Sequence, residues 1–168
     1  MIESQRLRLR RLRPSDERDL IALDSDPDVM RYVGSPPGPR TPEETARRTR
    51  QRIQEDQGPL GFWVVEDRAT GDFHGLGGLI RMPSDDDIEL AYRLARRSWG
   101  QGIATEAAAA LLRYAFGTLA LPKVVAVTYP ENRPSQRVLE KLGFIAQGVR
   151  DYKGVRAAYY VFTAPAPL

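Results

Sequence analysis

Hydrophobic and polar positions divide the chain into short stretches of strand-like alternation and longer stretches with helical spacing. Alternation with a period of two, or a short apolar run, predicts strands, and apolar residues three and four positions apart predict helices. Strands are expected over residues 7–12, 60–66, 73–81, 88–94, 124–127, 145–150 and 157–163. This mixture predicts an α/β fold, with helices between the first two strands and around the fifth.

The helix boundaries carry ordinary capping signals. Ser15 and Asp26 are predicted N-caps of two short helices, and Thr41 with Glu44 forms a capping box for a third helix that runs to about Gln57. A long helix is expected from residue 103 to 116, and a last one from 132 to 143, where Gly143 ends it as a C-cap.

The most informative stretch joins the strand at 88–94 to the long helix through a loop with two glycines, Gly100 and Gly102. A glycine loop that opens a helix is a predicted anion site, because free NH groups and the positive end of the helix dipole point out of the first turn. Glycine also leaves room for a phosphate to approach the backbone.

Two common phosphate loops do not fit this stretch. A P-loop requires a lysine after the glycine, and the dinucleotide fingerprint requires a third small residue where this chain has Thr105. A flexible entry to a helix and an unrelated nucleotide-binding domain remain as alternatives on this loop alone.

The pattern Arg97-x-x-Gly100-x-Gly102 resembles the coenzyme A pyrophosphate loop of the GNAT N-acetyltransferase superfamily. The surrounding WGQGIATEA is especially similar to the RimJ/RimL-type branch, which acetylates protein N-termini, small amines and some antibiotics. A second stretch, from Asn132 through Ser135 to Gly143 and Phe144, resembles the family's Asn-x-x-Ser segment. Both motifs occur in the expected order and context, which argues against the nucleotide-binding alternative.

The resemblance implies the GNAT fold: a mixed, mostly antiparallel twisted sheet of about seven strands, splayed at the cofactor site and flanked by helices. It implies one domain over residues 1–168 with a core of about 6–163, and acetyl-CoA as cofactor. The implied cofactor-binding residues are Tyr92, Leu94, Ala95, Arg97, Ser98, Trp99, Gly100, Gln101, Gly102, Ile103, Ala104, Thr105, Asn132 and Ser135. A strand irregularity at 92–95 is expected to free backbone NH groups for the thioester and pantetheine.

Direct transfer of acetyl to an amine needs a base and a proton donor. Glu89 is the candidate base, since its apolar neighbours would raise its pKa, although an outward-facing acid on an alternating strand fits the same pattern. By resemblance Ser135 protonates the leaving thiolate, and Asn132 orients pantetheine or a water molecule. Tyr152 and Tyr159 are less favoured donors.

Composition narrows the function classes further. The chain has 168 residues, no cysteine and one histidine, so cysteine nucleophiles, thiolate metal sites and histidine metal clusters are not expected. Its net charge of +3 comes from scattered arginines, which does not predict nucleic-acid binding. No long apolar run or secretory signal is visible, and we expect a cytoplasmic monomer or homodimer.

The acceptor is harder to predict. The basic helix at 41–57 fits either a substrate-facing surface or a solvated helix with ion pairs, and the latter is favoured. Residues 29–40 form a candidate specificity loop, and the acidic turn at 85–87 would suit a cationic amine or simply aid solubility. His74, in a glycine-rich strand, is favoured as structural. A catalytically weak acetyl-CoA sensor is the competing function.

Overall fold

The computed structural model describes residues 1–55, 58–83 and 86–164. The strands are β1 (Ile2–Glu3), β2 (Leu7–Arg11), β3 (Gly61–Asp67), β4 (Phe73–Arg81), β5 (Ile88–Leu94), β6 (Lys123–Thr128), β7 (Ile145–Tyr152) and β8 (Val155–Thr163). The helices are α1 (Glu17–Ser25), α2 (Pro27–Met30), α3 (Pro42–Glu55), α4 (Ile103–Arg113) and α5 (Arg133–Leu142). Short 3-10 turns η1 (Pro14–Asp16) and η2 (Arg96–Ser98) precede α1 and α4, and α4 continues into a π-helical turn, η3 (Tyr114–Thr118).

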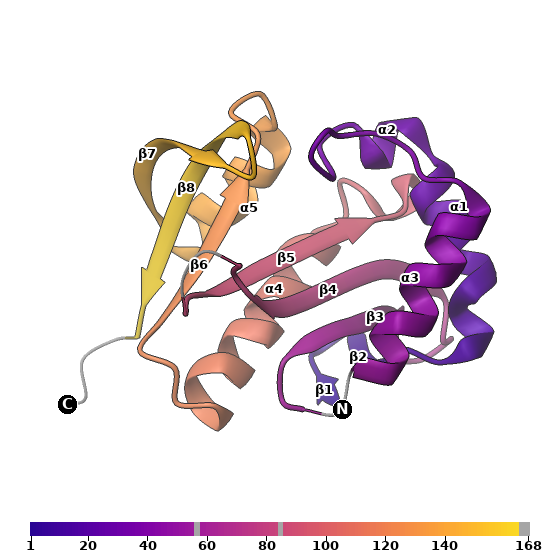
Figure 1. Ribbon diagram of the computed structural model, residues 1–168. Helices are drawn as coiled ribbons and strands as arrows, with labels where there is room; N and C mark the ends of the chain where they lie inside the picture. The colour runs from indigo at the N-terminus through magenta and orange to yellow at the C-terminus, as the bar shows by residue number, and fades with distance from the viewer. Residues whose placement is uncertain (56–57, 84–85, 165–168) are drawn as a thin grey trace.

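One eight-stranded sheet, in the order β1-β2-β3-β4-β5-β6-β8-β7, forms the centre of the molecule (Figure 1). All neighbouring strands are antiparallel except β5 and β6. The GNAT fold expected from the resemblance is therefore confirmed, with one more strand than the expected seven because residues 2–3 pair with β2. The expected strand boundaries agree with the structure to within a few residues.

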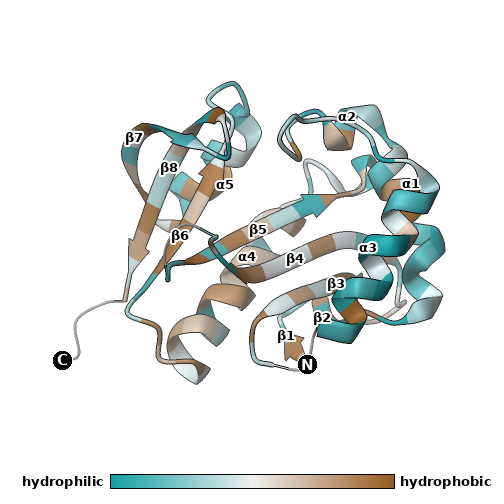
Figure 2. Ribbon diagram, viewed as in Figure 1, coloured by the Kyte–Doolittle hydropathy of each residue, from teal (hydrophilic) through white to brown (hydrophobic). Residues whose placement is uncertain are grey.

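Helices cover both faces of this sheet. Ala107 and Leu111 of α4 pack with Leu139 of α5 against β2, β3 and β5 on one face. On the other face Leu20 and Met30, from α1 and α2, pack against β3 and β4. Helix α3 lies on this second face and is largely hydrophilic, as Figure 2 shows.

The helix boundaries confirm most of the capping predictions. Asp26 caps α2 by accepting from the NH of Asp28, and Thr41 and Glu44 exchange the two hydrogen bonds of a capping box. The prediction that Ser15 is an N-cap is wrong, because it lies inside η1 and α1 begins at Glu17. Helix α3 ends at Glu55 in the described part of the chain, and Gln57 lies outside that part.

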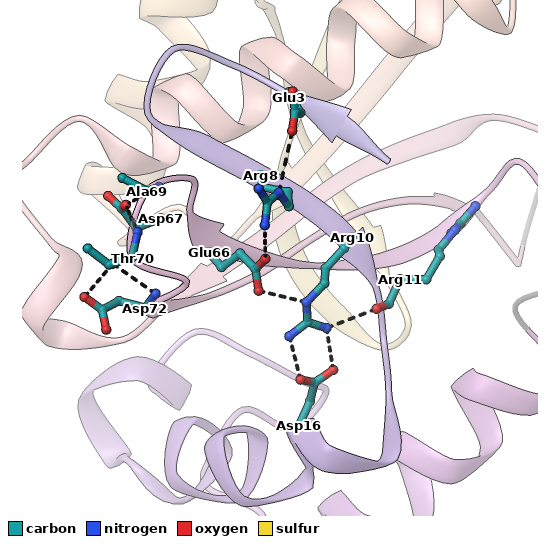
Figure 3. A network of polar contacts seen from close by, with 10 residues as sticks. All are labelled: Glu3, Arg8, Arg10, Arg11, Asp16, Glu66, Asp67, Ala69, Thr70 and Asp72. Carbon is teal, nitrogen blue, oxygen red and sulfur yellow. Dashed lines mark hydrogen bonds and ion pairs between the residues drawn. The ribbon is translucent and has the colours of Figure 1, made fainter.

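The side chain that replaces Ser15 in fixing this corner is Asp16. Its carboxylate accepts two bonds from the guanidinium of Arg10, at 2.8 and 2.9 Å (Figure 3). It also accepts the NH of Arg13. Arg10 also donates to Glu66 of β3 at 2.7 Å. Because all three charged side chains are largely buried, this network fixes η1 against β2 and β3.

Replacing Arg10 by alanine is expected to lower the free energy of unfolding by about 3–5 kcal/mol, because two buried carboxylates would lose their main partner. Denaturant titration of both proteins measures the difference. As a control, Arg81→Ala removes an ion pair with Asp86 that is open to solvent, and its effect should stay below about 1 kcal/mol. Similar losses in the two variants would contradict the proposed importance of the network.

Candidate active site

The candidate active site lies where β5 and β6 separate. The two strands share a single pair of residues, Glu89 and Val125, whereas β5 and β4 pair along their whole length. In an antiparallel ladder the backbone groups of alternate residues point toward one neighbour. Since the NH of Ala95 donates to His74 of the preceding β4 strand, the NH groups of Tyr92 and Leu94 point into the gap.

This arrangement confirms the splayed sheet but not its expected cause. The register between β4 and β5 runs without a shift from Ile88 to Leu94, so the irregularity expected at 92–95 is absent from these described residues. The gap opens because β6 turns away. Of the predicted backbone donors, Tyr92 and Leu94 face it, and Ala95 does not because His74 already accepts its NH.

The glycine loop has the backbone shape of an anion site. Gly100 and Gly102 have φ values of +72° and +76°, a left-handed conformation that disfavours side chains. Among the described residues, no protein group accepts the NH groups from Gly100 to Thr105. A Cβ atom added to Gly100 would meet no atom within 4 Å, so the backbone there faces open space. These properties fit a pyrophosphate at the N-terminus of α4.

Other predicted loop residues hold the loop together instead. The NH groups of Ser98 and Trp99 donate to the carbonyls of Ala95 and Arg96, and the Trp99 indole donates to the carbonyl of Leu94 at 2.8 Å. Ser98 is 2% exposed and its hydroxyl contacts Nδ1 of His74, and the Arg97 guanidinium donates to the carbonyl of Phe73. An anion at this loop would therefore meet backbone groups, with His74 in a supporting position.

The remaining predicted loop residues stabilise the loop and the first turn of α4. The Gln101 side chain donates to the carbonyl of Arg97 at 2.6 Å, Ile103 is buried in the core, and Ala104 and Thr105 are half-buried in the first turn of α4.

A brace from the N-terminus was missed by the sequence analysis. The Glu106 carboxylate accepts from Ser4 and from the NH and guanidinium of Arg6, and Arg6 also donates to the carbonyl of Gln101. An acid in the first turn of a helix is so common that its sequence signal could not reveal a partner about one hundred positions away.

Glu89 lies at the mouth of the gap on the face of β5 that points toward α1–α3. Its side chain is 8% exposed, which rules out the alternative of an outward-facing, solvated acid. Burial raises the pKa of Glu89, while a hydrogen bond from Tyr152 and the charge of Lys153 partly lower it. The Tyr152 hydroxyl donates to Oε2 at 3.0 Å, and no described donor contacts Oε1.

Ser135 lies on the other side of the same strand, at the start of α5. Its hydroxyl is 3.1 Å from the Tyr92 hydroxyl, which also contacts the Ser135 carbonyl at 3.2 Å. Burial raises the pKa of Tyr92 to about 12, with the Ser135 bond opposing it, so Tyr92 keeps its proton at neutral pH. Asn132 caps α5 by accepting the NH of Ser135 at 3.3 Å, so its carbonyl oxygen positions the helix.

A cavity of about 540 Å³ connects these groups. It brings Glu89, Tyr92, Asn132 and Ser135 together, and it also reaches Tyr152. Tyr159 is engaged elsewhere, with Asp87 at 3.2 Å. The sequence analysis missed the arginines of the cavity wall, since it favoured a solvated helix for α3. They are Arg40, Arg48, Arg52 and Arg93.

A strand gap beside a helix terminus with free NH groups, and a buried carboxylate at the mouth of the gap, fit an acyltransferase that uses coenzyme A thioesters. A sequence model of the acetyltransferase (GNAT) domain matches residues 6–145. The chain belongs to the GNAT family and is an acetyl-CoA-dependent N-acetyltransferase.

Relatives extend over most of the chain. It is 36% identical to the uncharacterized protein YkkB of Bacillus subtilis over 143 residues, which is 83% of this chain and 82% of that protein. It is 32% identical to the uncharacterized N-acetyltransferase p20 of Bacillus licheniformis, over 95% and 93% of the two chains. A GNAT-family acetyltransferase from Bacillus anthracis has the same fold, with a TM-score of 0.85, 25% identity and coverage of 96% and 97%.

Among the described residues, no helix is both long enough and apolar enough to cross a bilayer.

Replacing Gly100 by valine is expected to weaken acetyl-CoA binding at least tenfold, because a β-branched residue disfavours this backbone conformation and its side chain would fill the anion site. Calorimetric titration measures the affinity. The matched control is Gly148→Val in β7, where φ is +83° and the space is equally open. Equal affinity in the Gly100 variant and the wild type would refute the pyrophosphate assignment.

Proposed function

We propose that this protein transfers acetyl directly from acetyl-CoA to a primary amine within a ternary complex, as the RimJ/RimL-type branch does. The observation that supports this proposal is the placement of Glu89 and Ser135 on one cavity, at opposite faces of β5 and beside the gap. No cysteine is available for a covalent acyl intermediate. The catalytic unit is one domain over residues 1–168.

Acetyl-CoA would be held by the NH groups from Gly100 to Thr105 and by those of Tyr92 and Leu94 that face the gap. When bound, it supplies an acyl group already activated as a thioester. The pantetheine arm of acetyl-CoA would pair with the free NH groups of β5 in the gap beside β6, next to the cavity that contains Glu89.

The proposed proton transfers use side chains on both faces of β5. Glu89 accepts the proton of the ammonium group through Oε1, directly or through a water molecule, because Tyr152 occupies Oε2. Ser135 donates a proton to the departing sulfur, and its contact with Tyr92 keeps the hydroxyl oriented. Solvent returns a proton to Ser135, and Glu89 releases the ammonium proton to solvent, so both groups return to their starting states. Asn132 contributes by capping the helix that carries Ser135.

The sensor alternative shares this cofactor site but needs no working base. Calorimetric titration with acetyl-CoA, followed by a thiol-release assay on a panel of amines and peptides, separates the two. Binding followed by thiol release supports the enzyme. Binding with no release from any amine favours the sensor.

Glu89→Gln is expected to lower kcat by about 10²–10⁴-fold with little change in acetyl-CoA affinity, because the amide cannot accept the proton. In the wild type, the rate should fall as the pH falls through the raised pKa of Glu89, since the protonated carboxyl is no longer a base. A kcat–pH profile of both proteins measures this limb.

Tyr152→Phe is the matched control for this profile. It removes a hydrogen bond that lowers the pKa of Glu89, so the acidic limb should move to higher pH while the carboxylate remains. If the kcat–pH profile of Glu89→Gln has the same shape as that of the wild type, Glu89 is excluded as the base.

Ser135→Ala is expected to lower kcat by about 10²-fold, and Tyr92→Phe by less, because Ser135 is the direct donor and Tyr92 acts through it. Single-turnover thiol release with a fixed amine measures both rates. A larger loss in the Tyr92 variant than in the Ser135 variant would reverse these roles.

A further inference from the structure

One part of the cavity wall carries an excess of positive charge. Four guanidinium groups line it: Arg93 comes from β5, Arg40 from the segment before α3, and Arg48 and Arg52 from α3. The acid among them is Asp24, which is 1% exposed at the end of α1. Four cations thus surround one buried carboxylate.

Asp24 is fully engaged by the deepest of these groups. Arg93 donates to both of its oxygens at 2.9 and 3.2 Å, Arg40 donates at 2.8 Å, and the Thr45 hydroxyl contacts it at 3.4 Å. Arg48 and Arg52 make no ion pair with any described carboxylate. The nearby Glu55 accepts a hydrogen bond from Gln51 and lines, together with Arg48 and Arg52, a smaller neighbouring cavity of about 300 Å³.

Two other residues, Gly78 and Phe62, position Arg52 over the sheet. A Cβ atom on Gly78 would lie 2.8 Å from the ring of Phe62, so only glycine lets this ring lie across β4. The Arg52 guanidinium stacks on the ring, 4.1 Å from its centre. Burial and the charges of Arg93, Arg40 and Arg48 outweigh Asp24 and lower the pKa of Arg52 to about 9, so it is cationic and uncompensated at neutral pH.

These arginines and the candidate base, Glu89, lie on the same face of the sheet. Phe62 pairs with Gly78 and Gly78 with Ala91, so Phe62 lies two strands from Ala91 on the same face, and Glu89 lies two residues further along β5. Strand spacing and rise place the Cα atoms of Phe62 and Glu89 about 12 Å apart. An acceptor with its amine at Glu89 therefore extends its other end toward Arg52.

Two hydrogen bonds limit the size of that acceptor. The Ser35 hydroxyl donates to the carbonyl of Lys153 at 2.8 Å, and the Tyr129 hydroxyl donates to the carbonyl of Gly34 at 2.9 Å. They join the loop after α2 to the β7–β8 turn and to the segment before α5, all of which line the cavity. A bridged cavity of this size favours a small molecule over a folded protein terminus.

We propose that the acceptor is a small primary amine that also carries an anionic group, a carboxylate or a phosphate, which Arg48 and Arg52 bind while Glu89 receives the amine. This inference rests on the proposed function and adds the substrate class. It replaces the expectation of a cationic amine: of the acidic turn, Asp86 and Asp87 pair with Arg81 and Lys123, and Asp85 lies outside the described residues.

The test compares amines that differ only in the anion. The pairs are 4-aminobutyrate with butylamine, 6-aminohexanoate with hexylamine, and phosphoethanolamine with ethanolamine; diaminobutane and peptides beginning Ala-Asp or Ala-Asn complete the panel. The expected kcat/KM of the best anionic amine exceeds that of its neutral partner at least tenfold, since a charge-assisted hydrogen bond contributes this much.

Arg52→Gln should reduce this preference about ten- to hundredfold, mainly through the KM of the anionic amine. The matched control, Arg50→Gln, removes the same charge from an exposed position of α3 outside the cavity, and should keep the preference. A purely structural role of Arg52 would instead change both members of each pair equally, which would overturn the proposal. So would a preference for the neutral amines, diaminobutane or the peptides.

A binding measurement keeps this test separate from the proposed function. Calorimetry with glutarate, which has two carboxylates and no amine, should show binding to the wild type and to Arg50→Gln, and at least tenfold weaker binding to Arg52→Gln. Absence of binding to the wild type overturns the anion site. Failure of acetyl-CoA to bind, or of every amine to release thiol, overturns the proposed function instead, and glutarate binding still decides this inference.

Discussion

The separation of β5 from β6 is the constraint on which the rest of the active site depends. A parallel pair of strands would normally satisfy each other's backbone groups, and here they meet only at Glu89 and Val125. The NH groups of Tyr92 and Leu94 are left facing the gap, and an extended ligand can complete the ladder in place of β6. The sheet survives this interruption because β4–β5 and β6–β8 pair continuously on either side.

The period of two along β5 divides the chemistry between two faces of one strand. Tyr92 points to the face that carries α4 and α5, where it meets Ser135. Glu89, Ala91 and Arg93 point to the opposite face, toward α1–α3. The proposed base and Tyr92, which orients the proposed proton donor Ser135, are therefore held by a single strand, and Ser135 itself lies on helix α5 rather than on a loop.

How much the sequence could predict differs between backbone and side chains. The glycine loop, the helix that opens at Asn132 and the order of helices and strands along the chain follow from local signals, namely periodicity, φ preference and capping chemistry, and the structure confirms the order of the elements. The burial of Glu89 remained undecided, because alternation along β5 cannot show that β7 brings Tyr152 over the polar face. Arg52 was interpreted as solvated for the same reason, since its surroundings depend on where the Phe62 ring lies. Contacts between distant segments carry no signal in a single sequence.

Two side chains of the cavity, Glu89 and Arg52, carry charges that their surroundings disfavour, and the proposed acceptor would stabilise both. Burial opposes charge on Glu89 at one end, and the neighbouring cations oppose charge on Arg52 at the other. Each group lowers the stability of the ligand-free protein, and each would be relieved by a ligand of opposite charge. An amine at Glu89 and an anion at Arg52 relieve both at once. A cationic acceptor relieves only the first and adds repulsion to the second, so the distribution of charge in the cavity selects against it.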